Sequence, residues 1–259
     1  KEYITGLGDS YYIRYLGEFG KETWNKDVME QLSINDHAYI GLGDICHYSI
    51  NMLYCNKDKL TEAGRQVPYD MVRNGTWTLD EFFGITSGLY ADNGDGKRNN
   101  KDTYGFSALW DANGSAFMQG CDIYVATRNE NDMFELTLYN DRLIDMYDKL
   151  YDWSKDESTY IWDFANRANE NVTVDFLNGQ SYFTHEKLGT MYLESEFNLG
   201  MLPMPKYDTN QPEYAHVNWG NNIVLPNTIQ NKDMVGQVLE LMGYYSKTMV
   251  QQKYYDEVL

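Results

Sequence analysis

The sequence predicts an α/β fold, in which strands and helices alternate along the chain. Two patterns predict it. Short apolar runs such as residues 50–54 have the length of buried strands, whereas residues 141–153 repeat apolar side chains at helical spacing. Polar turns separate these segments, and we find no internal repeat or low-complexity tract. With 259 residues, of which 42% are hydrophobic and 23% charged, the chain is long enough to bury a core.

The first half of the chain predicts these elements in order. Residues 37–45 form a strand followed by a Gly-Asp loop. Residues 50–54 are almost continuously apolar, which is typical of a strand buried on both faces. A short helix at 58–63 ends at Gly64. Thr78 and Glu81 have the spacing of a capping box, so a helix begins there. Its apolar stripe comprises Leu79, Phe82, Phe83 and Leu89.

The second half continues the alternation. Residues 103–110 form a strand that ends at Trp110, and Asn140 caps the amphipathic helix 141–153. A helix at 169–177 and strands at 181–185, 197–205 and 218–226 follow. The last helix runs from 232 to 259. Its expected apolar face comprises Met234, Val235, Val238, Leu239, Met242 and Tyr245.

The charge and composition exclude several classes of partner. The formal net charge of −18 repels nucleic acid and anionic membranes, and it disfavours an anionic ligand unless a local basic pocket is present. The three cysteines lack the spacing of a disulfide framework or a zinc site. The 23 tyrosines suit sugars, which stack on rings and bond to hydroxyls, although most of these rings are expected to fill half-buried positions. The chain contains neither a signal peptide nor an apolar run of spanning length. It is therefore either cytoplasmic or a processed piece of something longer, as its abrupt ends also suggest.

Five motifs, in this order, carry a resemblance to a known family. They are YCNKD at 54–58, WTLDEF at 77–82, NGDG at 93–96 followed by Tyr104-Gly105, FLNGQSYF at 176–183, and Met204-Pro205. This order resembles the family 1 bacterial extracellular solute-binding proteins, which include the maltose-binding proteins. The resemblance covers residues 37–245. It is more specific than any one of its motifs.

The resemblance implies a type II periplasmic-binding-protein-like fold, in which two α/β lobes joined by hinge strands grip a solute. This chain would supply most of the second lobe and remnants of the first. Residues 1–45 would be a remnant of lobe one, 46–225 would form lobe two, and 226–259 would be a return helix to lobe one. The implied function is capture of a carbohydrate for an ABC importer, without catalysis. The implied protein is an extracellular, monomeric lipoprotein that docks on permease subunits.

Two segments combine a tryptophan with polar groups suited to a sugar. Trp110, Asp111 and Asn113 follow a strand, and ligands of open α/β sheets bind beyond strand ends. The alternative is a core tryptophan, with Asp111 capping a helix. Trp219 and Asn221 precede the return strand, where amides can donate to and accept from a polyol. The alternative is a Gly-Asn turn beside a packed tryptophan.

Two further positions are candidates for ligand contact. His185 and Glu186 come at the end of the expected strand, directly after residues 181–184, near where the resemblance places an aromatic ligand residue. Because a His-Glu pair departs from that pattern, an exposed polar turn is the alternative. Tyr48 marks the crossing between lobes, where its ring would either face the cleft or pack in the hinge.

Residues 91–102 resemble a calcium loop of the EF-hand type. With Gly96 as the turn glycine, Asn93 and Asp95 take the third and fifth ligand positions and Asp102 takes the twelfth. Ala91 occupies the first position, and Asp102 is shorter than the usual glutamate. Both changes weaken binding. The expectation is therefore either a structural calcium ion or no cofactor, with a solvated polar turn.

Two other functions compete with solute binding. A glycoside hydrolase would also use rings and carboxylates, but it needs two carboxyl groups facing one bond. A surface sensor or adhesion protein could use the same fold, because a fold does not fix a function.

Overall fold

A computed structural model describes residues 4–5, 23–34, 38–46, 48–162, 171–188, 195–216, 219–226 and 228–257, without the side chains of Ile4, Thr5, Tyr48, 110–113, Trp162 and Trp219. The chain forms two compact units. Unit 1 comprises Lys1–Ser49, Arg128–Glu135 and Trp219–Leu259, and unit 2 comprises Ile50–Thr127 and Leu136–Asn218. The lobe boundaries predicted after residues 45 and 225 lie a few residues from these divisions and stay predictions.

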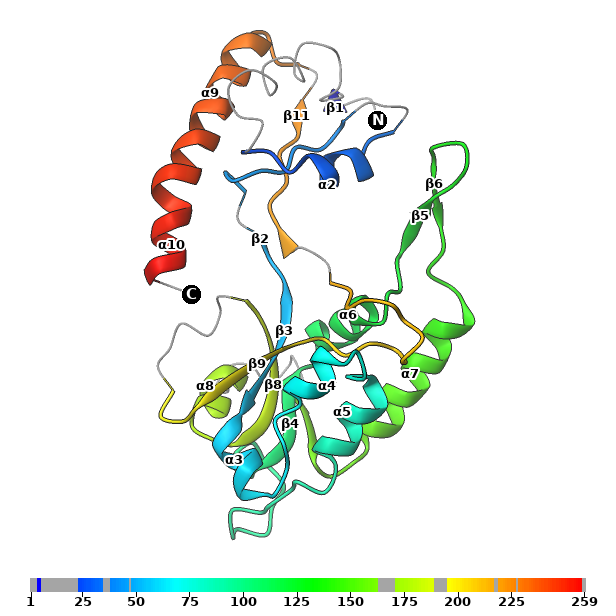
Figure 1. Ribbon diagram of the computed structural model, residues 1–259, viewed down its shortest axis with the longest axis vertical. Coiled ribbons are helices and arrows are strands. Elements are labelled where there is room, and N and C mark those ends of the chain that lie inside the picture. Colours follow the sequence, from blue (N-terminus) through cyan, green and yellow to red (C-terminus); the bar gives the residue numbers. More distant parts are fainter. Residues whose placement is uncertain are drawn as a thin grey trace. The chain divides into compact units, whose positions relative to one another are not determined.

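Unit 2 is built on a five-stranded mixed sheet with the order β7-β4-β8-β3-β9 (Figure 1). Its strands are β3 (Asn51–Asn56), β4 (Tyr104–Leu109), β7 (Thr159–Trp162), β8 (Ser181–Lys187) and β9 (Leu199–Pro203). β4 runs parallel to β7 and β8, whereas β3 runs antiparallel to β8 and β9. All residues of β3 except Met52 are buried, which confirms the strand predicted from its continuous apolar run.

Helices lie on both faces of this sheet, and Figure 1 shows α5 and α7 on the side opposite α8. They are α3 (Lys57–Glu62), α4 (Tyr69–Arg73), α5 (Leu79–Thr86), α6 (Trp110–Gly120), α7 (Asp141–Ser154) and α8 (Val172–Leu177). The predicted caps are confirmed for α5 and α7, where Thr78 and Asn140 accept a bond from the amide three residues on. The α/β class is confirmed as well. Leu89 lies beyond the end of α5, so its assignment to that apolar stripe is wrong.

The core of unit 2 centres on the fully buried ring of Phe82. Its centroid lies 5.3 Å from Trp153, 5.5 Å from Phe106 and 5.6 Å from Phe183. Aromatic pairs at such separations add to the free energy of burial. Gly105 lets α5 approach β4, because a Cβ atom there would lie only 2.0 Å from the carbonyl oxygen of Thr86.

Unit 1 has short strands and a small core. β1 (Ile4–Thr5) pairs with β11 (Leu225–Pro226), and β2 (Tyr48–Ser49) pairs with β10 (Trp219–Gly220). The strand predicted at the start of 37–45 is wrong, because only isolated bridges form at Gly41 and Gly43, whereas the Gly-Asp loop that follows it is a turn at Asp44. His37 lies outside the described residues. The helix predicted from 232 divides into α9 (Lys232–Tyr245), a π-helical turn (Ser246–Gln251) and α10 (Gln252–Glu257).

Two contacts hold unit 1 together around α2 (Lys26–Gln31). The indole of Trp24 donates to the carboxylate of the buried Glu240 at 3.1 Å. Arg128, in the hairpin of β5 (Ala126–Arg128) and β6 (Phe134–Leu136), donates to carbonyl oxygens at the end of α2. The sequence analysis did not identify this hairpin. Among the described helices, none combines the length and hydropathy needed to cross a bilayer.

Candidate functional site

The candidate site begins at one edge of the unit 2 sheet. β4, β7 and β8 are parallel, so their carboxyl ends lie at the same edge, and β3 begins there because it runs the opposite way. The pairings of Leu109 with Trp162 and of Asn51 with Lys187 mark this edge. Ligands of open α/β sheets bind beyond such carboxyl ends.

Trp110, Asp111 and Asn113 lie at this edge, but they form the first turn of α6 and not a loop. The sequence analysis gave a helix here only as the alternative, with Asp111 as its cap, because the small and polar residues give a weak apolar periodicity. The helix begins at Trp110, so Asp111 is not its cap. Their side chains lie outside the description, so ligand contact stays a prediction. Leu109 at the N-cap has no side-chain oxygen, and no side chain caps α6 from there.

Tyr48, Trp219 and Asn221 belong to unit 1. The backbone of Tyr48 pairs with Gly220, so the structure brings the predicted hinge position next to the predicted return segment. Asn221 is exposed. The side chains of Tyr48 and Trp219 lie outside the description. Their ligand roles therefore stay predictions.

His185 and Glu186 lie within β8, so their placement after a strand is wrong. His185 is 6% exposed and pairs with Leu53 of β3, on the face that carries the aromatic core. Burial, with a smaller contribution from Lys187, lowers the pKa of His185 to about 4. Its Nε2 atom has no partner among the described residues. Glu186 accepts a 2.7 Å bond from the hydroxyl of Thr173. Packing therefore accounts for the position of His185, and the bond from Thr173 accounts for that of Glu186, so their ligand roles stay predictions.

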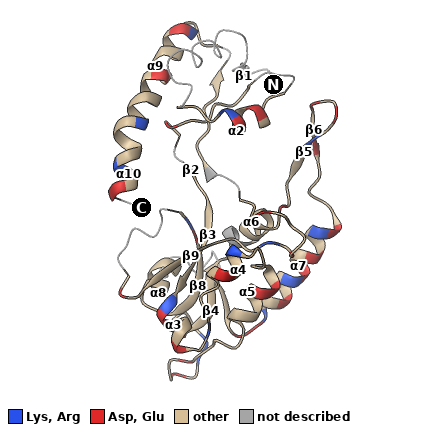
Figure 2. Cartoon of the chain, in the orientation of Figure 1, with Lys and Arg blue, Asp and Glu red and all other residues tan. Residues whose placement is uncertain are grey.

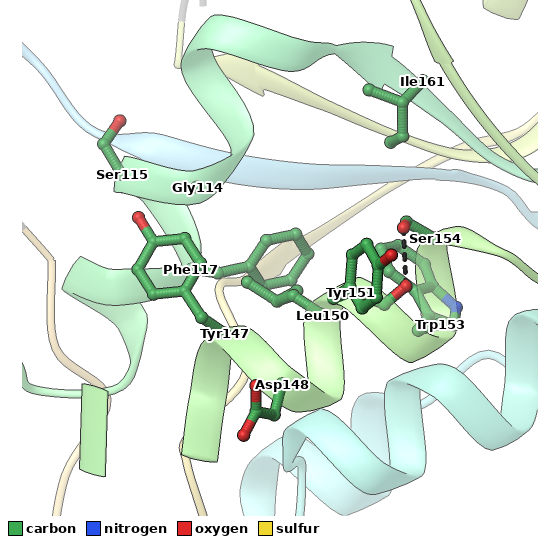
Figure 3. A pocket seen from close by; sticks show the side chains of 10 residues that line it. All are labelled: Gly114, Ser115, Phe117, Tyr147, Asp148, Leu150, Tyr151, Trp153, Ser154 and Ile161. Atoms are coloured by element: carbon green, nitrogen blue, oxygen red, sulfur yellow. Dashed lines mark hydrogen bonds between the residues drawn. The ribbon is translucent and has the colours of Figure 1, made fainter. Parts of the chain in front are cut away.

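A pocket of about 560 Å³ lies between α6, α7 and β7 (Figure 3). Its size is within the range of small-molecule sites. The lining residues are Gly114, Ser115, Phe117, Tyr147, Asp148, Leu150, Tyr151, Trp153, Ser154 and Ile161. Gly114 directly follows the predicted ligand segment 110–113, so the pocket adjoins the strand-end edge.

Two tyrosines on successive turns of α7 line the pocket with exposed aromatic rings. Tyr147 is 45% exposed and Tyr151 62% exposed, although the helical spacing places Tyr147 on the core face of α7. Figure 3 shows both rings beside Phe117 and Leu150. The ammonium of Lys155 lies 3.7 Å from the centroid of the Tyr151 ring, so one face of that ring is covered. The spacing of four residues between the tyrosines, which places both rings on one side of a helix, was the sequence signal that could have indicated this site.

The loop at 91–102 brings three carboxylates together. Asp92, Asp95 and Asp102 each place an oxygen within 4.8 Å of the others. Asp92 was not among the predicted ligands, because the EF-hand frame assigns the first position to Ala91. Asn93 uses its side-chain oxygen to accept the amide of Asp95.

Backbone amides of the loop and two flanking tyrosines donate hydrogen bonds to the buried carboxylate of Asp102. Asp102 accepts bonds from the amides of Asn93 and Asn99 and from the hydroxyls of Tyr90 and Tyr104. Burial raises the pKa of Asp102, but these bonds together lower it below its ordinary value. The conformation of the loop is therefore accounted for without an ion, and calcium binding stays a prediction.

Comparison with known proteins gives one family and many structural relatives. A family profile described as bacterial extracellular solute-binding protein matches residues 8–258. No curated protein sequence matches the chain.

Three solved structures illustrate the likeness. A solute-binding protein of an ABC transporter from Agrobacterium radiobacter K84, in complex with ribitol, has a TM-score of 0.63 and 13% identity over 99% of this chain and 61% of its own. UgpB from Mycobacterium tuberculosis, in complex with glycerophosphocholine, has a TM-score of 0.62 and 14% identity over 94% of this chain and 55% of its own. The galacto-N-biose/lacto-N-biose I-binding protein of Bifidobacterium longum has a TM-score of 0.62 and 12% identity over 100% of this chain and 58% of its own. The chain thus spans less than two thirds of each of these relatives, and at these identities the likeness shows the fold.

Proposed function

Because the chain belongs to the bacterial extracellular solute-binding protein family, we propose that it binds an uncharged carbohydrate or polyol for delivery to an ABC importer. The observation that carries the proposal is the pocket beside the carboxyl ends of β4 and β7, with its two tyrosine rings. A ring supplies a flat face for the C–H groups of a sugar, and its hydroxyl supplies a hydrogen-bonding group. Three solved relatives were determined with ribitol, maltose and lacto-N-biose, which supports this class of solute.

The local charge also supports a neutral solute. Among the described lining residues, Asp148 is the one Asp, Glu, Lys, Arg or His, and Figure 3 shows its carboxylate directed away from the tyrosine rings. No Lys or Arg is among the described residues that line the pocket. Lys155, which covers one face of Tyr151, is paired with Asp152 at 3.4 Å. An anionic solute would therefore have to compete with that carboxylate, whereas a polyol needs only ring faces and hydroxyl groups.

The proposed mechanism is non-covalent. The solute enters between two lobes, the lobes close about the hinge strands, and the closed protein docks on the permease subunits. We propose an extracellular, monomeric protein that is anchored as a lipoprotein in its full-length form. We also propose that it does not change its solute, so incubation with an oligosaccharide should release no shorter sugar on chromatography.

Calorimetric titration of the full-length protein with maltose, lacto-N-biose and ribitol tests the proposal. Tyr147→Ala should weaken the binding of the best solute about fivefold, since one stacked ring contributes on the order of 1 kcal/mol. Tyr139→Ala is the matched control, because Tyr139 is 85% exposed and does not line the pocket. Equal affinity in both variants would show that the solute does not bind in this pocket. An amino acid or peptide bound in preference to every sugar would refute the proposed solute class.

A further inference from the structure

Gly114 lies inside α6, at a position where a helix disfavours glycine. Relative to alanine, glycine lowers the stability of a helix interior more than any residue except proline. The φ angle of Gly114 lies outside the left-handed region, so the backbone conformation does not require glycine. Gly114 is also the one glycine among the described residues that line the pocket. The space that its missing side chain leaves in the pocket wall therefore needs another explanation.

The hydroxyl of Tyr147 lies against that space. A Cβ atom on Gly114 would be 3.2 Å from the Oη atom of Tyr147, but 3.6 and 3.8 Å from its Cε1 and Cζ atoms. Only the first of these distances is shorter than the ordinary contact range of about 3.5–4.0 Å. Figure 3 shows the Tyr147 hydroxyl directed toward the turn of α6 that carries Gly114 and Ser115. A methyl group at position 114 would therefore displace the hydroxyl and, with it, the ring.

The ring of Tyr147 takes its position from packing and not from a charged partner. Figure 2 shows charged residues along the length of α7, but its two basic residues are engaged elsewhere. Arg142 donates to Gln211 at 2.7 Å. Lys149 pairs with Asp80 at 3.3 Å. Because Tyr147 is 45% exposed, the contact with α6 restrains a ring that otherwise has room to tilt.

We propose that Gly114 is a positioning residue of the solute pocket. Its missing Cβ atom lets the Tyr147 hydroxyl lie against α6, and this contact holds the ring at the angle at which the solute packs on it. The inference rests on the proposed function, since it assigns Gly114 a role in the same pocket. Contacts to an aromatic face depend on angle and offset, so a tilt of the ring weakens binding.

A double-variant cycle in the full-length protein tests this role. Calorimetric titration uses whichever of maltose, lacto-N-biose and ribitol binds most tightly to the unchanged protein. Gly114→Ala should weaken that binding about two- to fivefold, up to the loss expected from removing the ring. Tyr147→Phe removes Oη and keeps the ring, which leaves only the contacts at 3.6 and 3.8 Å for an added methyl group. Adding Gly114→Ala to Tyr147→Phe should therefore leave the affinity of Tyr147→Phe unchanged.

Gly84→Ala is the matched control. Gly84 is exposed inside α5, and no neighbouring group lies within 4 Å of an added Cβ atom. This variant should leave the affinity unchanged and raise the midpoint of thermal unfolding, because alanine favours a helix. Gly114→Ala should raise the midpoint more in Tyr147→Phe than in the unchanged protein, where displacement of the hydroxyl offsets the gain.

Two outcomes overturn the proposal. Equal affinity of Gly114→Ala and the unchanged protein means that binding does not depend on how the ring is held. An equal loss from Gly114→Ala with and without Tyr147→Phe means that the methyl group acts on something other than the hydroxyl. Failure of the proposed function gives a different result, in which none of the three solutes binds to the unchanged protein and the positioning role falls with the pocket.

Discussion

The helices α7 and α9 have the same length and the same type of N-cap, but they differ in how much of their apolar surface is buried. Each has fourteen residues and begins at an asparagine whose side chain accepts a bond from the amide three residues on. α7 buries Met146 and Trp153 in the aromatic core of unit 2. α9 buries two glycines and Glu240, while most of its large apolar side chains remain exposed.

This difference shows that similar helical patterns do not imply similar stability. A helix obtains most of its stability from the apolar face that it packs, and α7 packs its face within the chain. For α9 the sequence pattern indicates a packed face, but unit 1 accommodates only part of it. Unit 2 is therefore expected to be the more stable of the two units, because α9 of unit 1 leaves much of its apolar surface exposed.

Paired methionine truncations should show the largest effect. Met146→Ala in α7 should lower the free energy of unfolding of unit 2 by about 2–5 kcal/mol, because it leaves a cavity at a fully buried position. Met242→Ala in α9 should change stability by less than about 0.5 kcal/mol in the 259-residue chain, because that side chain is 52% exposed. Urea denaturation, monitored by tryptophan fluorescence, measures both. A large loss from Met242→Ala in the isolated chain would show that α9 is already covered.

The pH dependence should differ in sign between the two units. The pKa of His185 falls from 6.5 to about 4 on folding, so neutral His185 contributes stability above pH 6.5 that is lost as the pH falls toward 4. The loss should reach at most about 3 kcal/mol. In unit 1, burial raises the pKa of Glu240 above 4.5, so its contribution is present below that pH and is lost as the pH rises through the folded pKa.

Hydrogen exchange in β3 and in α9, measured between pH 6.5 and 4, separates these two contributions. His185→Gln should remove the pH dependence of β3 in this window and leave that of α9 unchanged. The aspartates with lowered pKa, such as Asp102 and Asp156, act mainly below pH 3.8 and so do not obscure it. A β3 signal that keeps its slope in His185→Gln would contradict the assignment to this imidazole.

Much of unit 2 could be predicted from the sequence, because its local signals agree with its packing. Strand β3 is an apolar run buried on both faces, and α5 and α7 begin at strong N-caps. Helix α6 could not be predicted, since residues 110–115 include only one large apolar side chain. In unit 1, residues 38–45 have the composition of a strand but find only single bridging partners. Strand pairing depends on a neighbour, which a local pattern does not specify.

The candidate site was less predictable than the fold. The sequence predicted the strand that leads to Trp110, because that strand was recognisable, but Trp110 is the first residue of α6 and not the last of β4. It did not identify Tyr147 and Tyr151 as pocket residues, because amphipathic spacing cannot distinguish a ring that packs into a core from one that borders a cavity. His185 was misplaced for a related reason. A polar side chain is expected at the end of a strand, and its burial became evident only from the pairing of β8 with β3.

The two asparagine caps provide the smallest and most closely matched comparison. Asn140→Ala and Asn231→Ala remove equivalent bonds of 2.9 Å to Leu143 and 3.0 Å to Met234. Each should cost its helix about 1 kcal/mol. If α7 unfolds only together with unit 2, Asn140→Ala should lower the protection of every slowly exchanging amide in that unit. If α9 opens by itself, Asn231→Ala should accelerate exchange only within α9. A loss from Asn231→Ala that extends to the strands of unit 2 would mean that the two units unfold as one, and the contrast between α7 and α9 would then reflect exposure alone.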